Sequence, residues 1–127
     1  MPLLLDTQVV IWLQSDSFKL PRNTLEIILS EPKLYLSKVC VWEIAIKFKI
    51  GKLDLDQPME KFVQSFLSSY KAQVLDISLS HIYQTQLLPL HHRDPFDRLL
   101  IAQAVVEQIA IVSSDKLFDQ YGVNRLF

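Results

Sequence analysis

The sequence predicts an α/β protein: a three-layer fold with a central, mainly parallel sheet of four or five strands flanked by helices. Short continuous apolar runs, typical of strands buried on both faces, alternate along the chain with longer segments of helical periodicity. Parallel strands require such crossovers. The 127 residues contain two glycines, no repeat and no linker, so we expect a single domain over residues 1–127.

The first half of the chain divides into six predicted elements. They are a strand at 3–6, helices at 7–14 and 21–31, a strand at 34–37, and helices at 37–51 and 58–70. The helix SKVCVWEIAIKFKIG is the best defined of these, because Ser37 can cap its start and Lys47 and Lys49 suit its C-terminal end. Gly51 can adopt the left-handed conformation that ends it.

The second half predicts two more strands and two more long helices. They are a strand at 72–77, helices at 78–88 and 95–108, and a strand at 109–114. The tail KLFDQYGVNRLF allows one short helix and a last edge strand. Asp94 followed by Pro95 is a helix start, since Asp caps backbone N–H groups and Pro suits the first helical position.

Composition favours a cytoplasmic protein. The single cysteine, Cys40, excludes a disulfide within the chain, and it is expected to be a small buried apolar residue. No secretory signal or membrane-spanning run is present in the sequence. A net charge of -1 gives no overall attraction to phosphate backbones, so nucleic-acid binding would need a local basic patch or bound cations.

Two aspartates follow predicted strands directly. Asp6 closes the first apolar strand and Asp115 closes the run IAIVSS. Each alone could be only a loop or helix cap. In α/β folds, however, the functional crevice lies beyond the carboxyl ends of the strands, so two acids in this position suggest a shared site.

Glu43 is a carboxylate on an apolar stripe. It projects from its helix on the same side as Val39, Ile46 and Ile50. Because an unpaired buried charge is very costly, Glu43 must be protonated, paired or bound to a cation. The pairing alternative is a salt bridge to Lys47, four residues further on.

The stretch HHRDPFDRLLIA supplies a fourth acid, Asp97, in the first turn of its helix on the face of Ile101 and Ala104. Asp97 could be a capping-box acid or a metal ligand, and both roles can hold together because a helix N-terminus stabilises an ionised carboxylate. Asp94 either caps the helix only or also supports the metal.

Other readings of the same region fail on particular residues. A kinase loop beginning at His92 would need Asn where the chain has Leu99. Zinc at His91 and His92 lacks a complementary Cys or His cluster. His81 is expected to be a surface residue or one whose hydrogen bonds are satisfied. Aspartyl phosphotransfer at Asp6 lacks the second aspartate of the Asp-x-Asp signature.

Three segments in order resemble the PIN domain superfamily, and more closely the VapC-type ribonuclease toxins. They are LLLDTQVVIWL, SKVCVWEIAIKFKIGKL and DPFDRLLIAQAVVEQIAIVSSDKLFDQYGV. The resemblance implies that Asp6, Glu43, Asp97 and Asp115 are the four acids of the site and that Thr7 orients Asp6. It also implies RNA cleavage with Mg²⁺ or Mn²⁺, a homodimer, and inhibition by an antitoxin encoded beside the toxin.

The chemistry agrees with those residue types. Four ionised carboxylates within about 5 Å repel each other by roughly 3 kcal/mol per pair at an effective dielectric near 20, so they need a cation. Oxygen-only ligands select hard ions such as Mg²⁺. Basic residues that could contact phosphates are Lys47, Lys49, Lys52, Arg93 and Arg98. The alternative function is a catalytically inactive PIN-like module that binds a partner protein.

Overall fold

A computed structural model describes residues 1–91 and 94–127, and its centre is one parallel sheet. The strands are Leu3–Leu5 (β1), Leu34–Ser37 (β2), Gln73–Leu75 (β3), Ala110–Val112 (β4) and Arg125–Leu126 (β5). They are ordered β3-β2-β1-β4-β5, and all four neighbouring pairs are parallel. The predicted α/β class with a mainly parallel sheet is confirmed.

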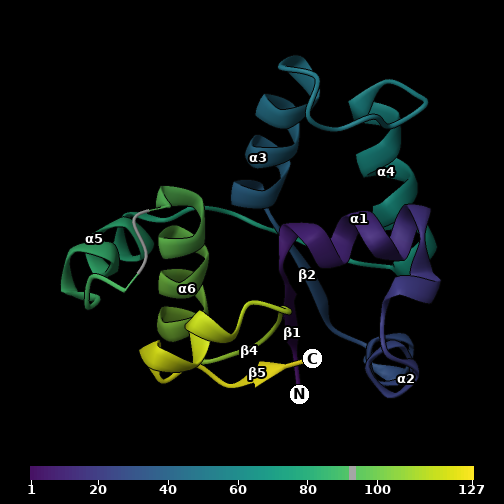
Figure 1. The fold of residues 1–127 in the computed structure, drawn as a ribbon. Coiled ribbons are helices and arrows are strands. Elements are labelled where there is room, and N and C mark those ends of the chain that lie inside the picture. The colour runs from purple at the N-terminus through teal and green to yellow at the C-terminus, as the bar shows by residue number, and fades with distance from the viewer. Residues whose placement is uncertain (92–93) are drawn as a thin grey trace.

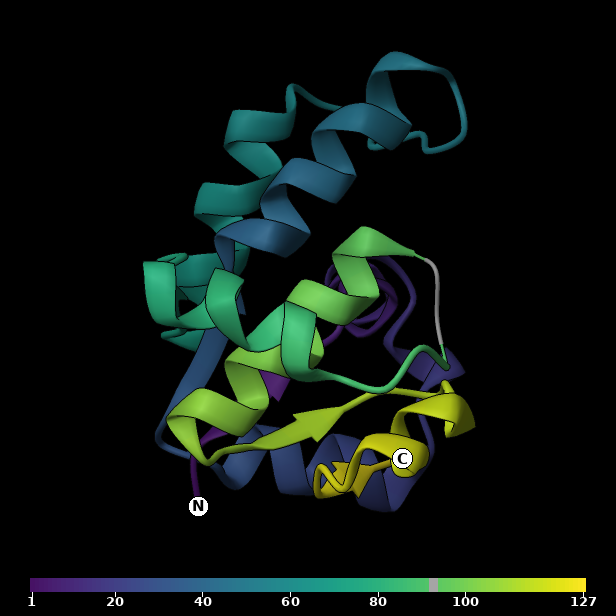
Figure 2. The same ribbon diagram turned by 90° about the vertical axis from the view of Figure 1, so that its left-hand side faces the viewer.

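Helices cover both faces of this sheet. The α-helices are Thr7–Ser15 (α1), Arg22–Ser30 (α2), Lys38–Lys49 (α3), Met59–Tyr70 (α4), Leu79–Leu87 (α5) and Pro95–Glu107 (α6), with 3-10 turns at Ser17–Lys19 and Lys116–Tyr121. Figure 1 shows α5 and α6 on one side of the strands and α1 and α2 on the other. In both ribbon views α3 and α4 stand together at one end (Figure 2). No helix in the described segments is long and apolar enough to cross a membrane.

The centre of the core is β1. All three of its leucines are at most 1% exposed, because β2 and β4 pair with it and helices cover both of its faces. The three residues of β4 are also buried. Continuous apolar runs were the signal for both strands, and full burial explains why neither run alternates with polar residues. The carboxyl ends of β1, β2 and β4 therefore open at the same edge of the sheet.

The ends of α3 and α6 follow the local rules that predicted them. Ser37 Oγ accepts a hydrogen bond of 3.0 Å from Val39 N at the start of α3, and Gly51 takes the left-handed φ of +78° just after its end. At α6, Asp94 is the N-cap and Pro95 is the first helical residue. These ends fix where Glu43 and Asp97 stand relative to the sheet.

The apolar stripe predicted on α3 is buried only in part. Val39 is buried, but Ile46 is 37% exposed and Ile50 is 58% exposed. The cause is the projection of α3 beyond the sheet, so that its C-terminal half has less protein to pack against (Figure 1). The apolar stripe on which Glu43 lies is thus core at one end and open surface at the other.

A buried polar network ties α3, α5 and α6 together. Gln103 of α6 is fully buried, and its Oε1 accepts a hydrogen bond of 2.5 Å from Ser37 Oγ. Its Nε2 lies 3.2 Å from Asp76 O and 3.4 Å from His81 Nδ1. His81 Nδ1 also accepts from Ser78 N at 3.0 Å. The neutral ring therefore carries its proton on Nε2, facing Glu107 Oε2 at 2.8 Å.

Replacing Gln103 with Met should destabilise the protein by about 2 to 4 kcal/mol, because Asp76 O loses a donor and Ser37 Oγ loses an acceptor inside the core. Urea denaturation followed by circular dichroism measures this. Gln64→Met on the exposed side of α4 is the matched control and should change stability by less than about 0.5 kcal/mol. Equal effects of the two substitutions would contradict a structural role for the network.

Candidate functional site

The four acids singled out in the sequence come from four separate elements near one edge of the sheet. Asp6 directly follows β1, and Asp115 lies three residues after β4. Glu43 lies in the middle of α3, which starts immediately at the end of β2. Asp97 lies in the first turn of α6. The acids therefore lie near the carboxyl ends of the central strands, which is where parallel sheets have their functional crevice.

Asp6 is held in place on both carboxylate oxygens. Oδ1 accepts from Thr7 N at 2.8 Å, which caps α1, and Oδ2 accepts from Ser113 Oγ at 2.7 Å. Burial raises the pKa of Asp6 above its ordinary value, while these two hydrogen bonds lower it, and the charges of Glu43 and Asp115 raise it further. The ionised form of Asp6 is therefore less favourable than that of an exposed aspartate.

Glu43 is only 9% exposed, and its pairing is now defined. Its Oε1 accepts a hydrogen bond of 2.7 Å from Thr7 Oγ1, and its Oε2 lies 2.7 Å from Lys47 Nζ. The salt-bridge alternative from the sequence is thus present, together with the hydroxyl of Thr7, a residue that the resemblance assigned to Asp6. Thr7 contacts Asp6 through its backbone N–H and directs its hydroxyl to Glu43, so it fixes two acids at once.

Asp115 caps a 3-10 turn, and Asp97 lies in the first turn of α6. Asp115 Oδ1 accepts from Leu117 N at 3.0 Å, and Asp115 N donates to Ser113 Oγ at 3.0 Å. Asp97 is half-buried, and its backbone N lies 3.5 Å from Asp94 Oδ1. Asp94 Oδ1 also accepts from Phe96 N at 2.9 Å, so the expected capping role of Asp94 is confirmed.

Electrostatics places these acids in one neighbourhood. Burial raises the pKa of the Cys40 thiol, a hydrogen bond with Thr7 lowers it, and the charges of Asp6, Glu43 and Asp97 raise it further, so all three carboxylates act electrostatically on this one buried group. Asp115 in turn acts on Asp6. Cys40 itself is fully buried, as expected, with Sγ 3.5 Å from Leu5 O.

The four acids act on one another or on the same buried thiol, but they do not form a complete set of metal ligands. Among residues 1–91 and 94–127, no three Cys, His, Asp or Glu side chains are arranged to hold a metal ion as they stand. The donor set nevertheless fits Mg²⁺ or Mn²⁺, because all donors are oxygens and Mg²⁺ commonly takes one or two carboxylates and fills its remaining positions with water. A tetrahedral zinc site, which needs nitrogen or sulfur ligands, does not fit.

The basic residues near the acids differ in what they contact. A hydrogen bond from Lys47 to Glu43 raises the lysine pKa, and the charges of Asp94 and Asp97 raise it further. Arg98 is not a free phosphate ligand, since its guanidinium donates to the carbonyls of Thr85, Leu88 and Pro89 at the end of α5 and just beyond it. Lys49 and Lys52 are exposed. Arg93 lies outside the described residues.

His81 and His91 have structural roles. His81, expected to be exposed or satisfied, is 2% exposed and satisfied within the Gln103 network. The His91 ring packs edge-on against Tyr121, with 5.1 Å between the ring centroids. His92, part of the rejected zinc and kinase readings, lies outside the described residues.

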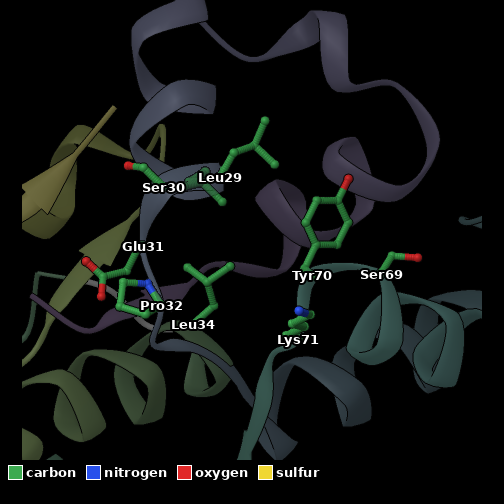
Figure 3. A pocket seen from close by; sticks show the side chains of 9 residues that line it. Leu29, Ser30, Glu31, Pro32, Leu34, Ser69, Tyr70 and Lys71 are labelled. Carbon is green, nitrogen blue, oxygen red and sulfur yellow. The ribbon is translucent and has the colours of Figure 1, made fainter.

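Two hollows in the surface differ in their relation to the acids. A groove of about 230 Å³ between α3 and the start of α6 is lined by Glu43, Lys47, Lys52 and Phe96. A hollow of about 470 Å³ lies between the ends of α2 and α4, where Glu31, Leu34 and Tyr70 line it (Figure 3). Because Leu34 is the first residue of β2, this second hollow lies at the amino ends of the strands, away from the acids.

Ser113 is a site residue that sequence reasoning missed. Its hydroxyl donates to Asp6 and accepts from Asp115 N, so it links the acids at the ends of β1 and β4. It is fully buried at the end of an apolar strand. A serine directly after a buried strand, two residues before an acid, was the available signal.

Solved structures share this fold. A chain of VapBC2 from Rickettsia felis, bound to promoter DNA, gives a TM-score of 0.76 at 16% identity, covering 99% of this chain and 98% of that chain. DNA-bound VapBC from Salmonella typhimurium gives 0.71 at 17%, covering 99% and 97%. VapBC-1 from nontypeable Haemophilus influenzae gives 0.68 at 17%, also covering 99% and 97%. At these identities the likeness concerns the fold.

Sequence comparison identifies the family. Among curated proteins, none matches the chain. The model of the PIN domain, by contrast, matches residues 3–124, which is nearly the whole length and includes all four acids. The fold, the strand order and this match agree with the resemblance seen in the three sequence segments. The chain therefore belongs to the PIN domain family.

Proposed function

We propose that this protein is a metal-dependent endoribonuclease that hydrolyses RNA phosphodiester bonds at Asp6, Glu43, Asp97 and Asp115. The observation that carries the proposal is Glu43, a buried carboxylate whose charge, with that of Asp115, raises the pKa of Asp6 at the open edge of the sheet. Buried like charges destabilise a protein, and such arrangements are concentrated at functional sites. A nuclease site is one example, and members of the PIN family are typically nucleases.

The four acids would hold Mg²⁺ or Mn²⁺, with Asp6, Asp97 and Asp115 as the main ligands and Glu43 positioning the ion or its water. A bound ion of this kind activates water and stabilises the charge that develops at phosphorus. The protein's own part is to fix the carboxylates. Ser113 and the backbone of Thr7 hold Asp6, while the Thr7 hydroxyl holds Glu43. Rigid ligands keep the ion where the scissile phosphate must lie.

The biological role we propose is that of a toxin paired with an antitoxin. The similar solved structures support it, because they are of VapBC assemblies, two of them bound to DNA. We further propose a homodimer that is inhibited by a separately encoded antitoxin protein. Co-expression with the product of the neighbouring reading frame would test the pairing, which predicts a stable complex that suppresses RNA cleavage.

A second function is favoured by one observation. Hydrogen bonds and an ion pair with other groups occupy oxygens of Asp6, Glu43 and Asp115, as expected of acids that serve only as caps and ion pairs. On that account the chain would be a catalytically inactive PIN-like module that holds a partner protein. The two functions differ in metal-dependent activity, which can be measured directly.

The first expected outcome concerns cleavage. The protein should cut RNA with Mg²⁺ or Mn²⁺ and not with EDTA, and Asp6→Asn and Asp97→Asn should each lower the rate by at least about 100-fold while remaining folded. Asp54→Asn is the control, because Asp54 is exposed and its amide replacement can still accept from Asp56 N. Full activity in both site variants, or cleavage in EDTA, would refute the assignment.

The second expected outcome concerns stability in the presence of metal. Millimolar Mg²⁺ should raise the melting temperature of the wild type by a few degrees, since an ion that binds only the folded state stabilises it by about 1 kcal/mol at several times its Kd. The melting temperature of Asp6→Asn should rise by less on addition of Mg²⁺. Differential scanning fluorimetry measures both proteins, with Na⁺ at equal ionic strength as the control. A wild-type curve that does not respond to Mg²⁺ would favour the inactive module.

The third expected outcome concerns pH without metal. Because the folded-state pKa of Asp6 is raised above 3.8, folded protein binds the proton more tightly than unfolded protein. This contribution to stability is present below pH 3.8 and is lost as pH rises through the folded-state pKa. In EDTA at neutral pH, Asp6→Asn should thus be at least as stable as the wild type, since Asn can still accept from Thr7 N and its amide N–H can donate to Ser113 Oγ, which reverses the second hydrogen bond. Urea denaturation over a pH series measures this, and a variant less stable at every pH would contradict it.

A further inference from the structure

The groove between α3 and α6 joins two chemically different regions. The groove is lined by two acidic residues, Glu43 and Asp94, and by two lysines, Lys47 and Lys52. Its apolar walls are Ile46, Ile50, Pro95 and Phe96. At about 230 Å³ it is smaller than the roughly 300–1,000 Å³ of sites that enclose drug-sized ligands, so it can admit only part of a polymer such as one base.

Lys47 is the cation that balances Glu43 in this structure. Its Nζ lies 2.7 Å from Glu43 Oε2, and the glutamate side chain is 11% exposed whereas the lysine side chain is 43% exposed. The ammonium thus reaches from the open groove toward a nearly enclosed carboxylate. Asp94 and Asp97 also act on it, so Lys47 stands among negative charges on more than one element.

A metal ion and Lys47 would compete for the same negative charge. An ammonium at Glu43 repels a divalent cation placed among the neighbouring acids, and it occupies one of the two Glu43 oxygens. The other oxygen is held by Thr7 Oγ1, so the carboxylate keeps its position when the lysine leaves. The lysine has a flexible four-carbon stem and can turn into the groove that it already lines.

We propose that Lys47 is an exchangeable counter-ion, which neutralises Glu43 in the metal-free protein and moves to an RNA backbone phosphate when a divalent ion binds. The proposal rests on the proposed ribonuclease function. Lys52 is a second phosphate contact in the same groove, and the apolar wall receives a base. RNA is the occupant because two ammonium groups and an aromatic ring line the groove beside Glu43, while the carboxylate of Asp94, which also lines it, is held by the N-terminus of α6 as its cap.

The exchange links metal and RNA binding. Once the ion has replaced Lys47 at Glu43, the ammonium is available to phosphate, so each ligand strengthens binding of the other. Lys47 then differs from an ordinary surface lysine in a measurable way. Its removal should tighten metal binding while weakening RNA binding, two effects of opposite sign from one substitution.

The experiment measures Mn²⁺ affinity by isothermal titration calorimetry, and RNA affinity in Mn²⁺ with a 2′-O-methyl oligoribonucleotide that cannot be cleaved. Lys47→Met should tighten Mn²⁺ binding about five-fold and weaken oligonucleotide binding by a similar factor. Lys47→Gln, which keeps a donor for Glu43 and so protects folding, should also tighten Mn²⁺ binding.

Two matched lysines on the same surface serve as controls. Lys52→Met should weaken oligonucleotide binding and leave Mn²⁺ affinity unchanged, because Lys52 lines the groove whereas the ion pair with Glu43 is made by Lys47. Lys49→Met removes the same charge from α3 at a position two residues, or about 200°, around the helix from Lys47. The charge of Lys49 made it a candidate phosphate contact in the sequence, but it does not line the groove, so its substitution should change neither affinity.

The outcomes separate this inference from the function on which it rests. A wild type that binds no Mn²⁺ overturns both. A wild type that binds Mn²⁺, with neither Lys47 variant binding it more tightly, overturns the exchange alone and leaves the nuclease proposal standing. Unchanged oligonucleotide binding in the Lys47 and Lys52 variants, with sedimentation shifted to a smaller species, assigns the groove to a second copy of the chain and also overturns it.

Discussion

The carboxylate of Glu43 is nearly enclosed by protein, and each of its oxygens is bound, one by the Thr7 hydroxyl and the other by Lys47. The backbone N–H of Thr7 donates to Asp6, the N-cap of α1, so the first helix, the third helix and the end of β1 meet at one threonine. Burying negative charge here is unfavourable unless a positive charge accompanies it. The charge of Glu43 also adds to the effect of burial in raising the pKa of Asp6, and Glu43 lines the α3–α6 groove together with its partner Lys47.

Sequence alone predicted those parts of the fold that local rules determine. LLL before Asp6 and the apolar run before Ser113 are buried strands, because a parallel strand covered on both faces has no reason to alternate. Asp94 caps the start of α6 and Pro95 is its first residue, as the local rules for helix starts predict. The acids that follow strand ends could be named in advance, since parallel strands direct their carboxyl ends to the same edge.

What could not be predicted depends on side chains far apart in the chain. Ser113 binds Asp6 across 107 positions, and Gln103 binds Ser37 across 66, so no local pattern contains either contact. Arg98 resembled a phosphate ligand by charge, but the carbonyls at the end of α5 take its donors. The exposure of Ile50 follows from how far α3 projects beyond the sheet, which helical periodicity does not specify.

We propose that Asp6, Glu43, Asp97 and Asp115 form a cation site in which Lys47 substitutes for the metal. Anomalous diffraction from crystals grown with Mn²⁺ tests it most directly, because it locates the ion and the lysine in one experiment. The account predicts an anomalous peak bound by Asp6 and at least one of Asp97 and Asp115, with Lys47 Nζ moved away from the 2.7 Å contact with Glu43. Absence of a peak at the acids, or a peak with that contact intact, would contradict it.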